Sequence, residues 1–130
     1  TYQDFHGYWP RQTDNPFTPY LNQATKYVVS STLSEPLPWE NSILLPGDPA
    51  VSVAALKAHS GPDLGVVGSA QLVRSLLAAD MIDRYLLLIH PLVIGQGRRL
   101  FDERGPGVEF ELVDSVATST GVIIATYQRR

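Results

Sequence analysis

The segment from Leu64 to Phe101 constrains the fold of this chain most, because it combines two apolar runs, a glycine turn and a helical pattern. Leu64 to Val67 is typical of a strand buried on both faces, and Gly68 ends it. Ser69 is a favourable helix N-cap, and Tyr85 to Ile89 is a second apolar run that is long enough for a strand. Between them, apolar residues recur at helical spacing: Leu72, Val73, Leu76, Leu77 and Ala79. The order predicts a βαβ-like unit.

The turn that opens this helix is a candidate phosphate-binding site. Gly68, Ser69 and Ala70 are small, so a phosphate can come close to the backbone N–H groups at the positive end of the helix. The alternative is an ordinary strand-to-helix turn, where Gly and Ser are also common. The three-glycine dinucleotide fingerprint is absent, which argues against a Rossmann domain.

Composition limits the class of protein. The chain has 130 residues, of which 44% are hydrophobic and 18% charged, with a formal net charge of -3. These values predict a single soluble globular domain. A weakly acidic chain without a basic stripe is a poor nucleic-acid binder, and no apolar run reaches the length of a membrane span.

Cysteine and histidine usage narrows the chemistry further. There is no cysteine, which excludes disulfides, thiol catalysis and cysteine-bound metals. The three histidines, His6, His59 and His90, lack metal-ligand spacing, so no metal site is expected. No secretory signal opens the chain, and a cytoplasmic enzyme or binding domain is the expectation.

The remaining pattern predicts an α/β domain with a mixed sheet. Thr1 to Gly7 is helix-like or irregular, and a long loop follows at 8–23, whose aromatic residues either line a pocket or cover the core. Asp48 is expected to cap a helix that begins at Pro49 and ends at Gly61. The other predicted strands are 26–32, 43–45, 108–116 and 121–127, of which the last two form an antiparallel hairpin.

Three segments of the chain resemble the dihydrofolate-reductase-like fold and, within it, the RibD C-terminal domain family of bacterial riboflavin-pathway reductases. The segments are VVGSAQLVRSLLAADMIDRYLLLIHPLVIGQGRRLF, KYVVSST and LVDSVATSTGVIIATYQ. The resemblance implies a three-layer α/β fold with a mixed, mostly parallel central sheet and a C-terminal antiparallel hairpin. It also implies a homodimeric, NADPH-dependent oxidoreductase that reduces a small pyrimidine- or pterin-like heterocycle.

Cofactor contacts carry over by position in the sequence. The resemblance implies that Thr1, the last member of a Gly-Arg-x-Thr motif, contacts a phosphate, and that Ser30, Ser31 and Thr32 hold the adenosine ribose and its phosphate. Ser69 departs from the family, which has two consecutive glycines here, often joined by a cis peptide bond. The resemblance implies that Gly68, Ser69, Ala70 and Gln71 contact the cofactor pyrophosphate and that Leu72 also belongs to the cofactor site.

The residues expected to bind substrate match the family less closely than the cofactor contacts do. Folate-reducing relatives place an arginine where this chain has Thr25, and a hydroxyl cannot replace a guanidinium that binds a carboxylate in two places. We therefore expect that dihydrofolate is not the natural substrate. Phe5, Tyr8 and Trp9 are expected to line the substrate pocket and to stack on a flat heterocycle.

The family pattern places Thr1 inside its first helix, so we expect residues 1–130 to be a single domain that lacks an N-terminal segment, including a central strand. Relatives have most of their substrate contacts in that segment, and no catalytic residue is named here. A non-catalytic nucleotide-binding or assembly domain that retains the fold is the alternative function.

The segment from His90 to Phe101 has two interpretations. Gly95 and Gly97 can form a tight loop that leaves Arg98 and Arg99 in solvent, or the two arginines can bind a substrate phosphate. His90 is followed by a proline at a strand end, which favours a structural role over acid–base catalysis.

Overall fold

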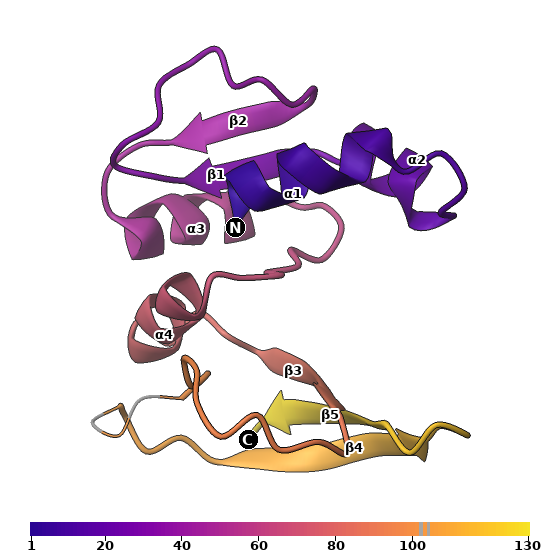
Figure 1. Ribbon diagram of the computed structural model, residues 1–130. Helices are drawn as coiled ribbons and strands as arrows, with labels where there is room; N and C mark the ends of the chain where they lie inside the picture. Colours follow the sequence, from indigo (N-terminus) through magenta and orange to yellow (C-terminus); the bar gives the residue numbers. More distant parts are fainter. Residues whose placement is uncertain (102, 104) are drawn as a thin grey trace. The chain divides into compact units, whose positions relative to one another are not determined.

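The computed structural model describes residues 1–101, 103 and 105–130. The chain divides into two compact units, residues 1–69 and residues 70–130 (Figure 1). No helix among the described residues combines the length and the apolar character that crossing a membrane requires.

The first unit contains helices and one parallel pair of strands, which lie side by side in Figure 1. Lys26 pairs with Ser42 at the start of this ladder, and Val29 pairs with Leu45 at its end. Parallel strands end at the same edge of a sheet, so the residues that follow both strands emerge together. The elements are α1 (Tyr2–Tyr8), the 3-10 helix η1 (Trp9–Arg11), α2 (Phe17–Gln23), β1 (Lys26–Val29), β2 (Ser42–Leu45) and α3 (Pro49–Lys57).

Trp39 is the most buried residue of the first unit, with 5% of its surface exposed. Its Nε1 donates a hydrogen bond to Oδ1 of Asn22 over 2.8 Å, and its backbone N donates to Oη of Tyr2 over 3.1 Å. Tyr2 in turn donates to Oγ of Ser42 over 3.1 Å. These bonds join α1, α2 and β2 around one indole ring, which is how so small a unit acquires a core.

Lys26 closes the carboxyl end of α2. Its Nζ donates to three carbonyl oxygens there, those of Leu21, Asn22 and Ala24, at 2.8, 3.2 and 2.8 Å. The last carbonyls of a helix have no partner within the helix, and an ammonium group satisfies them and their partial negative charge. Burial lowers the pKa of the Lys26 amine below its usual 10.5, and the nearby Glu40 carboxylate opposes that shift.

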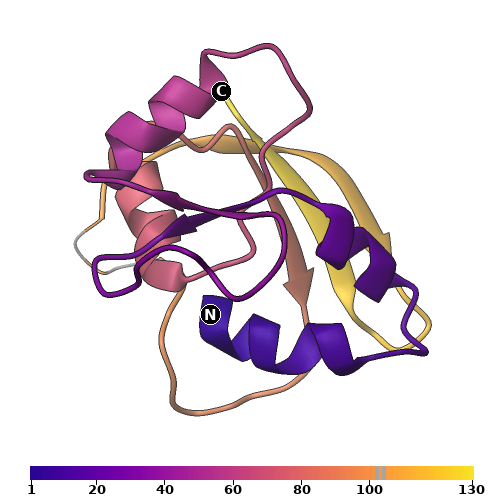
Figure 2. The same cartoon turned by 90° about the horizontal axis from the view of Figure 1, so that it is seen from above.

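The second unit contains α4 (Ala70–Ala78) and a three-stranded antiparallel sheet. The strands are β3 (Arg84–Ile89), β4 (Phe110–Ala117) and β5 (Ile123–Arg129). Figure 2 shows them side by side, with β5 between β3 and β4. An irregularity between Leu112 and Asp114 shifts the register of β4 against β5. The apolar core consists of Val73, Leu76, Leu77, Ile82, Tyr85 and Ala125.

The α/β class and the C-terminal antiparallel hairpin are confirmed. So is the start of α3, because Oδ1 of Asp48 accepts hydrogen bonds from the backbone N of Ala50 and of Val51 at 2.8 and 3.2 Å. The helix ends at Lys57, before Gly61. The pairing consists of one parallel ladder and two antiparallel ladders, in two separate sheets.

Two local predictions were wrong. Residues 64–67 do not form a strand among the described residues, and their side chains are exposed, Val67 by 75%. An apolar run forms a strand only where a neighbouring strand bonds its N–H and C=O groups, so the predicted βαβ-like unit is absent here. The segment 8–23 is not a plain loop, because it contains η1 and α2. Pro10 lies in the first turn of η1, where its missing N–H costs nothing.

Candidate cofactor-binding site

Thr1 and Gly68 lie in direct contact at the two ends of the first unit. A Cβ atom added to Gly68 would stand 3.4 Å from Cγ2 and 3.7 Å from Oγ1 of Thr1. The Thr1 side chain therefore lies beside the backbone of Gly68, which has no side chain of its own. Two residues that the family resemblance names as phosphate contacts are thus brought together by folding.

Gly68 adopts a backbone conformation that suits glycine, with φ of +132°. Its peptide bond to Ser69 is cis, although serine replaces the second glycine of the family pattern. Helix α4 begins at the next residue, Ala70. Of the predicted contacts, Ser69 directly precedes this helix, and Ala70, Gln71 and Leu72 form its first turn, where the helix dipole is positive.

Ser30, Ser31 and Thr32 form a separate turn directly after β1. Oγ of Ser30 accepts hydrogen bonds from the backbone N of Thr32 at 3.2 Å and of Leu33 at 3.1 Å, and it lies 3.3 Å from Oγ1 of Thr32. Ser30 therefore shapes the turn. Ser31 and Thr32 are exposed, so their side chains are accessible to a ligand.

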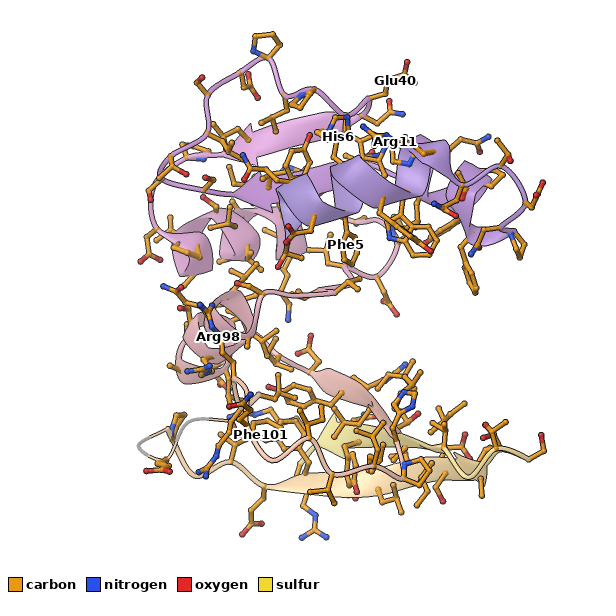
Figure 3. The ribbon with its side chains drawn as sticks, viewed as in Figure 1. Phe5, His6, Arg11, Glu40, Arg98 and Phe101 are labelled. Atoms are coloured by element: carbon orange, nitrogen blue, oxygen red, sulfur yellow. The ribbon has the colours of Figure 1, made fainter. Side chains whose placement is uncertain are left out.

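The three predicted pocket residues are neighbours on α1 and η1. The ring of Trp9 lies edge-on to the rings of Phe5 and Tyr8, with centroid distances of 6.4 and 5.2 Å. Tyr8 is 54% exposed. In Figure 3, Phe5 and His6 project from different sides of α1, and His6 lies 6.1 Å from the ring of Trp39 instead. The Phe5 side of α1 thus presents aromatic surface, and its role as a stacking site stays a prediction.

The segment after β3 follows the tight-loop interpretation. Gly95 and Gly97 have φ of +78° and +140°, which few other residues tolerate. Nη1 of Arg99 lies 2.6 Å from Oε1 of Glu103, so that guanidinium already has a carboxylate partner. A role of Arg98 in binding a substrate phosphate stays a prediction. His90 is exposed, and its carbonyl accepts a hydrogen bond from the backbone N of Leu92 over 2.9 Å.

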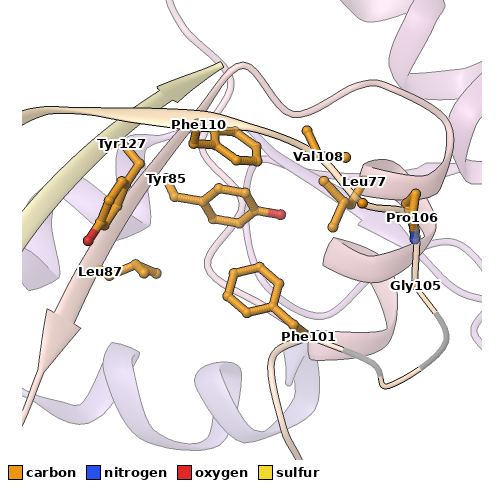
Figure 4. A pocket seen from close by; sticks show the side chains of 10 residues that line it. Leu77, Tyr85, Leu87, Phe101, Gly105, Pro106, Val108, Phe110 and Tyr127 are labelled. Atoms are coloured by element: carbon orange, nitrogen blue, oxygen red, sulfur yellow. The ribbon is translucent and has the colours of Figure 1, made fainter. Parts of the chain in front are cut away.

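Sequence reasoning missed one feature, an apolar cavity of about 550 Å³ in the second unit (Figure 4). Its walls come from α4, the three strands and the segment 105–108, and none of the predicted site residues lines it. The one sequence signal for this cavity is the spacing of Tyr85 and Leu87 in β3. Alternate residues of a strand share a face, so both side chains line the cavity.

The fold is that of a dihydrofolate-reductase-like α/β domain, which is a reductase-like domain in general terms. The chain belongs to the RibD C-terminal domain family, whose model matches residues 3–124. This confirms the family resemblance seen in the sequence.

Two proteins of Bacillus subtilis are similar to this chain in sequence. It is 29% identical over 108 residues to the uncharacterized protein YyaP of Bacillus subtilis (strain 168), which covers 82% of this chain and 56% of YyaP. It is 36% identical over 50 residues to the uncharacterized protein YwjB of the same strain, covering 38% of this chain and 29% of YwjB. The chain thus spans little more than half the length of the first relative and less of the second.

A solved structure confirms the fold. The crystal structure of a protein provisionally assigned to riboflavin biosynthesis, from Shewanella sp. PV-4, superimposes with a TM-score of 0.77 and 23% sequence identity. The match covers 98% of this chain and 70% of that one.

Proposed function

We propose that this chain is the NADPH-binding part of a reductase that acts on a small pyrimidine- or pterin-like heterocycle. The contact of Thr1 with Gly68 carries the proposal, because it joins two predicted phosphate contacts in a chain whose family is established. When bound, NADPH would supply the hydride for the ring reduction.

The residues around Gly68 fit a pyrophosphate. Gly68 has no side chain that would keep a phosphate from the backbone, and Oγ1 of Thr1 lies beside it as a hydroxyl donor. The helix dipole of α4, which begins at Ala70, places partial positive charge at this end of the helix. This arrangement binds an anion without a lysine or arginine.

The turn after β1 suits the adenosine end of the cofactor. Ser30 fixes the turn, while Ser31 and Thr32 are exposed and offer two hydroxyl groups. Hydroxyl groups donate to the phosphate that distinguishes NADPH from NADH. The proposal therefore includes a preference for NADPH.

The aromatic residues on α1 and η1 support a flat substrate. Phe5 and Trp9 present ring surface on which a heterocycle could stack, with Tyr8 at the exposed edge. Thr25 is exposed and uncharged, so a dicarboxylate tail such as that of folate has no arginine to bind at this position. We expect little turnover of dihydrofolate.

Titration calorimetry with NADPH and NADH tests the proposal. Ser69→Asp should weaken NADPH binding about tenfold or more, because it places a negative charge beside the predicted pyrophosphate. The matched control, Ser119→Asp, adds the same charge in the β4–β5 turn and should leave affinity unchanged. Equal effects of the two variants would exclude the phosphate site, and absence of binding to either nucleotide would favour the non-catalytic alternative.

The complete gene product is the material for the activity test. A pyrimidine or pterin that causes loss of NADPH absorbance would support the reductase, and dihydrofolate is the comparison substrate. A homodimer and a cytoplasmic location are part of the same proposal, and sedimentation analysis of the complete product tests the dimer.

A further inference from the structure

The cavity of the second unit has the size and surface of a small-molecule site. Its volume of about 550 Å³ lies within the range of ligand pockets, roughly 300–1,000 Å³. Aromatic and aliphatic side chains form its walls, among them Phe101, Phe110, Leu77 and Leu87. None of the lining residues that the structure describes carries a charge, so these residues offer a charged ligand no partner in exchange for its hydration.

Tyr85 supplies the polar group of this cavity. Its side chain is 8% exposed, and its hydroxyl is buried without a hydrogen-bond partner among the described residues. The rings of Phe110 and Phe101 stand edge-on to it at 5.2 and 5.5 Å. Figure 4 shows the Tyr85 hydroxyl directed inward among the side chains that line the cavity. A buried donor without an acceptor is unfavourable, and a ligand that supplies the acceptor removes that penalty.

We propose that this cavity binds a neutral, planar aromatic molecule whose carbonyl oxygen accepts a hydrogen bond from the Tyr85 hydroxyl. The ring of the ligand packs against the aromatic walls, and the single hydrogen bond fixes its orientation. The inference is independent of the proposed NADPH site, since no residue assigned to the nucleotide lines the cavity.

Two bicyclic probes of similar size test the inference. Coumarin is neutral and planar and carries a carbonyl, whereas naphthalene has the same shape without an acceptor. Ligand-observed NMR on the full chain should show coumarin bound, and Tyr85→Phe should weaken its binding about tenfold while leaving naphthalene unchanged. Tyr127→Phe is the matched control, because it removes the other lining tyrosine hydroxyl and should leave coumarin binding intact.

The outcomes separate the inference from its alternatives. It is overturned if coumarin does not bind at millimolar concentration, if Tyr85→Phe leaves coumarin affinity unchanged, or if Tyr127→Phe weakens it equally. A second measurement uses the unaltered protein, so that its result does not depend on whether the Tyr85→Phe variant folds. The Cζ resonance of Tyr85, labelled with carbon-13, should shift when coumarin binds and stay in place with naphthalene, and identical responses to both probes would also overturn the inference.

Discussion

The ammonium group of Lys26 stands over the ring of Trp39, 4.6 Å from its centre. The same atom donates three hydrogen bonds to the carbonyls at the end of α2. One side chain therefore connects the first residue of β1, the end of a helix and the buried indole of the first unit. A cation at this position is stabilised both by the negative face of the indole ring and by the negative end of the helix dipole.

Lys26→Met should lower the free energy of unfolding by about 2 kcal/mol, because the carbonyls lose their donor and the indole loses its cation. Urea denaturation followed by tryptophan fluorescence measures this change in the free energy of unfolding. Arg11→Met is the control, because it removes one exposed positive charge from the last turn of η1 in the same unit, and it should change stability by less than about 1 kcal/mol. Equal losses in both variants would show that net charge, and not this contact, is responsible.

Gly68→Ala should destabilise the protein by about 1–3 kcal/mol, because alanine is strained at the φ of +132°. Gly65 lies nearby in the sequence, has no atom within 4 Å of an added Cβ and has no such φ, so Gly65→Ala should change stability by less than about 1 kcal/mol. Urea denaturation compares the two variants.

The cause of the Gly68 effect can be separated from a clash with Thr1. The added Cβ would meet Cγ2 of Thr1 at an ordinary contact distance of 3.4 Å. Thr1→Ser removes that methyl group, and it should not restore the stability of Gly68→Ala. Full recovery in the double variant would mean that crowding, and not backbone strain, is responsible.

Stability should fall with rising pH in a way that depends on Tyr85. Burial raises the pKa of its phenol above the usual 10.0, so the unfolded chain releases this proton at lower pH than the folded one. The stability contributed by this group is complete below pH 10.0 and is lost as pH rises through the folded pKa. Urea denaturation between about pH 9 and about pH 11 should show the decline. Tyr85→Phe should flatten it and Tyr127→Phe should not, whereas the same decline in both variants would contradict the assignment.

Ser31→Ala should reduce the preference for NADPH over NADH about fivefold, because it removes an exposed hydroxyl from the predicted phosphate turn. Calorimetric titration with both nucleotides measures the ratio, and Ser34→Ala is the control for loss of a nearby serine. Ser30→Ala should weaken both nucleotides, since Oγ of Ser30 holds the turn itself. An equal loss of NADPH and NADH affinity in Ser31→Ala would contradict the specific role of Ser31.

Local signals in the sequence predicted the elements that depend on local chemistry. Asp48 followed by Pro49 marks the start of a helix by capping and by ring geometry, and both act within one turn. The β4–β5 hairpin likewise follows from two β-rich segments and a turn with Gly121 at φ of +82°.

Features that depend on distant partners could not be predicted in the same way. Trp39 lies in a proline-rich stretch without periodicity, and its burial depends on Tyr2, Asn22 and Lys26. The apolar residues 64–67 predicted a strand, but a strand requires a pairing neighbour that a local pattern does not contain. The cavity around Tyr85 could not be predicted from a local pattern either, because its walls come from four elements and a loop that are distant in the sequence. The Thr1–Gly68 contact was not predicted, because the family resemblance named each residue only as a phosphate contact and no local pattern joins the two ends of the unit.

The register shift in β4 makes Val113 a spare residue of the sheet. Leu112 pairs with Tyr127 and Asp114 pairs with Thr126, so Val113 is an extra position between consecutive partners. An evolving sequence could lose Val113 without changing any other pair. Loss of a residue elsewhere in β4 would exchange the faces of the residues beyond it. At Val113, therefore, β4 can lose a residue while the pairing of β4 with β5 stays the same.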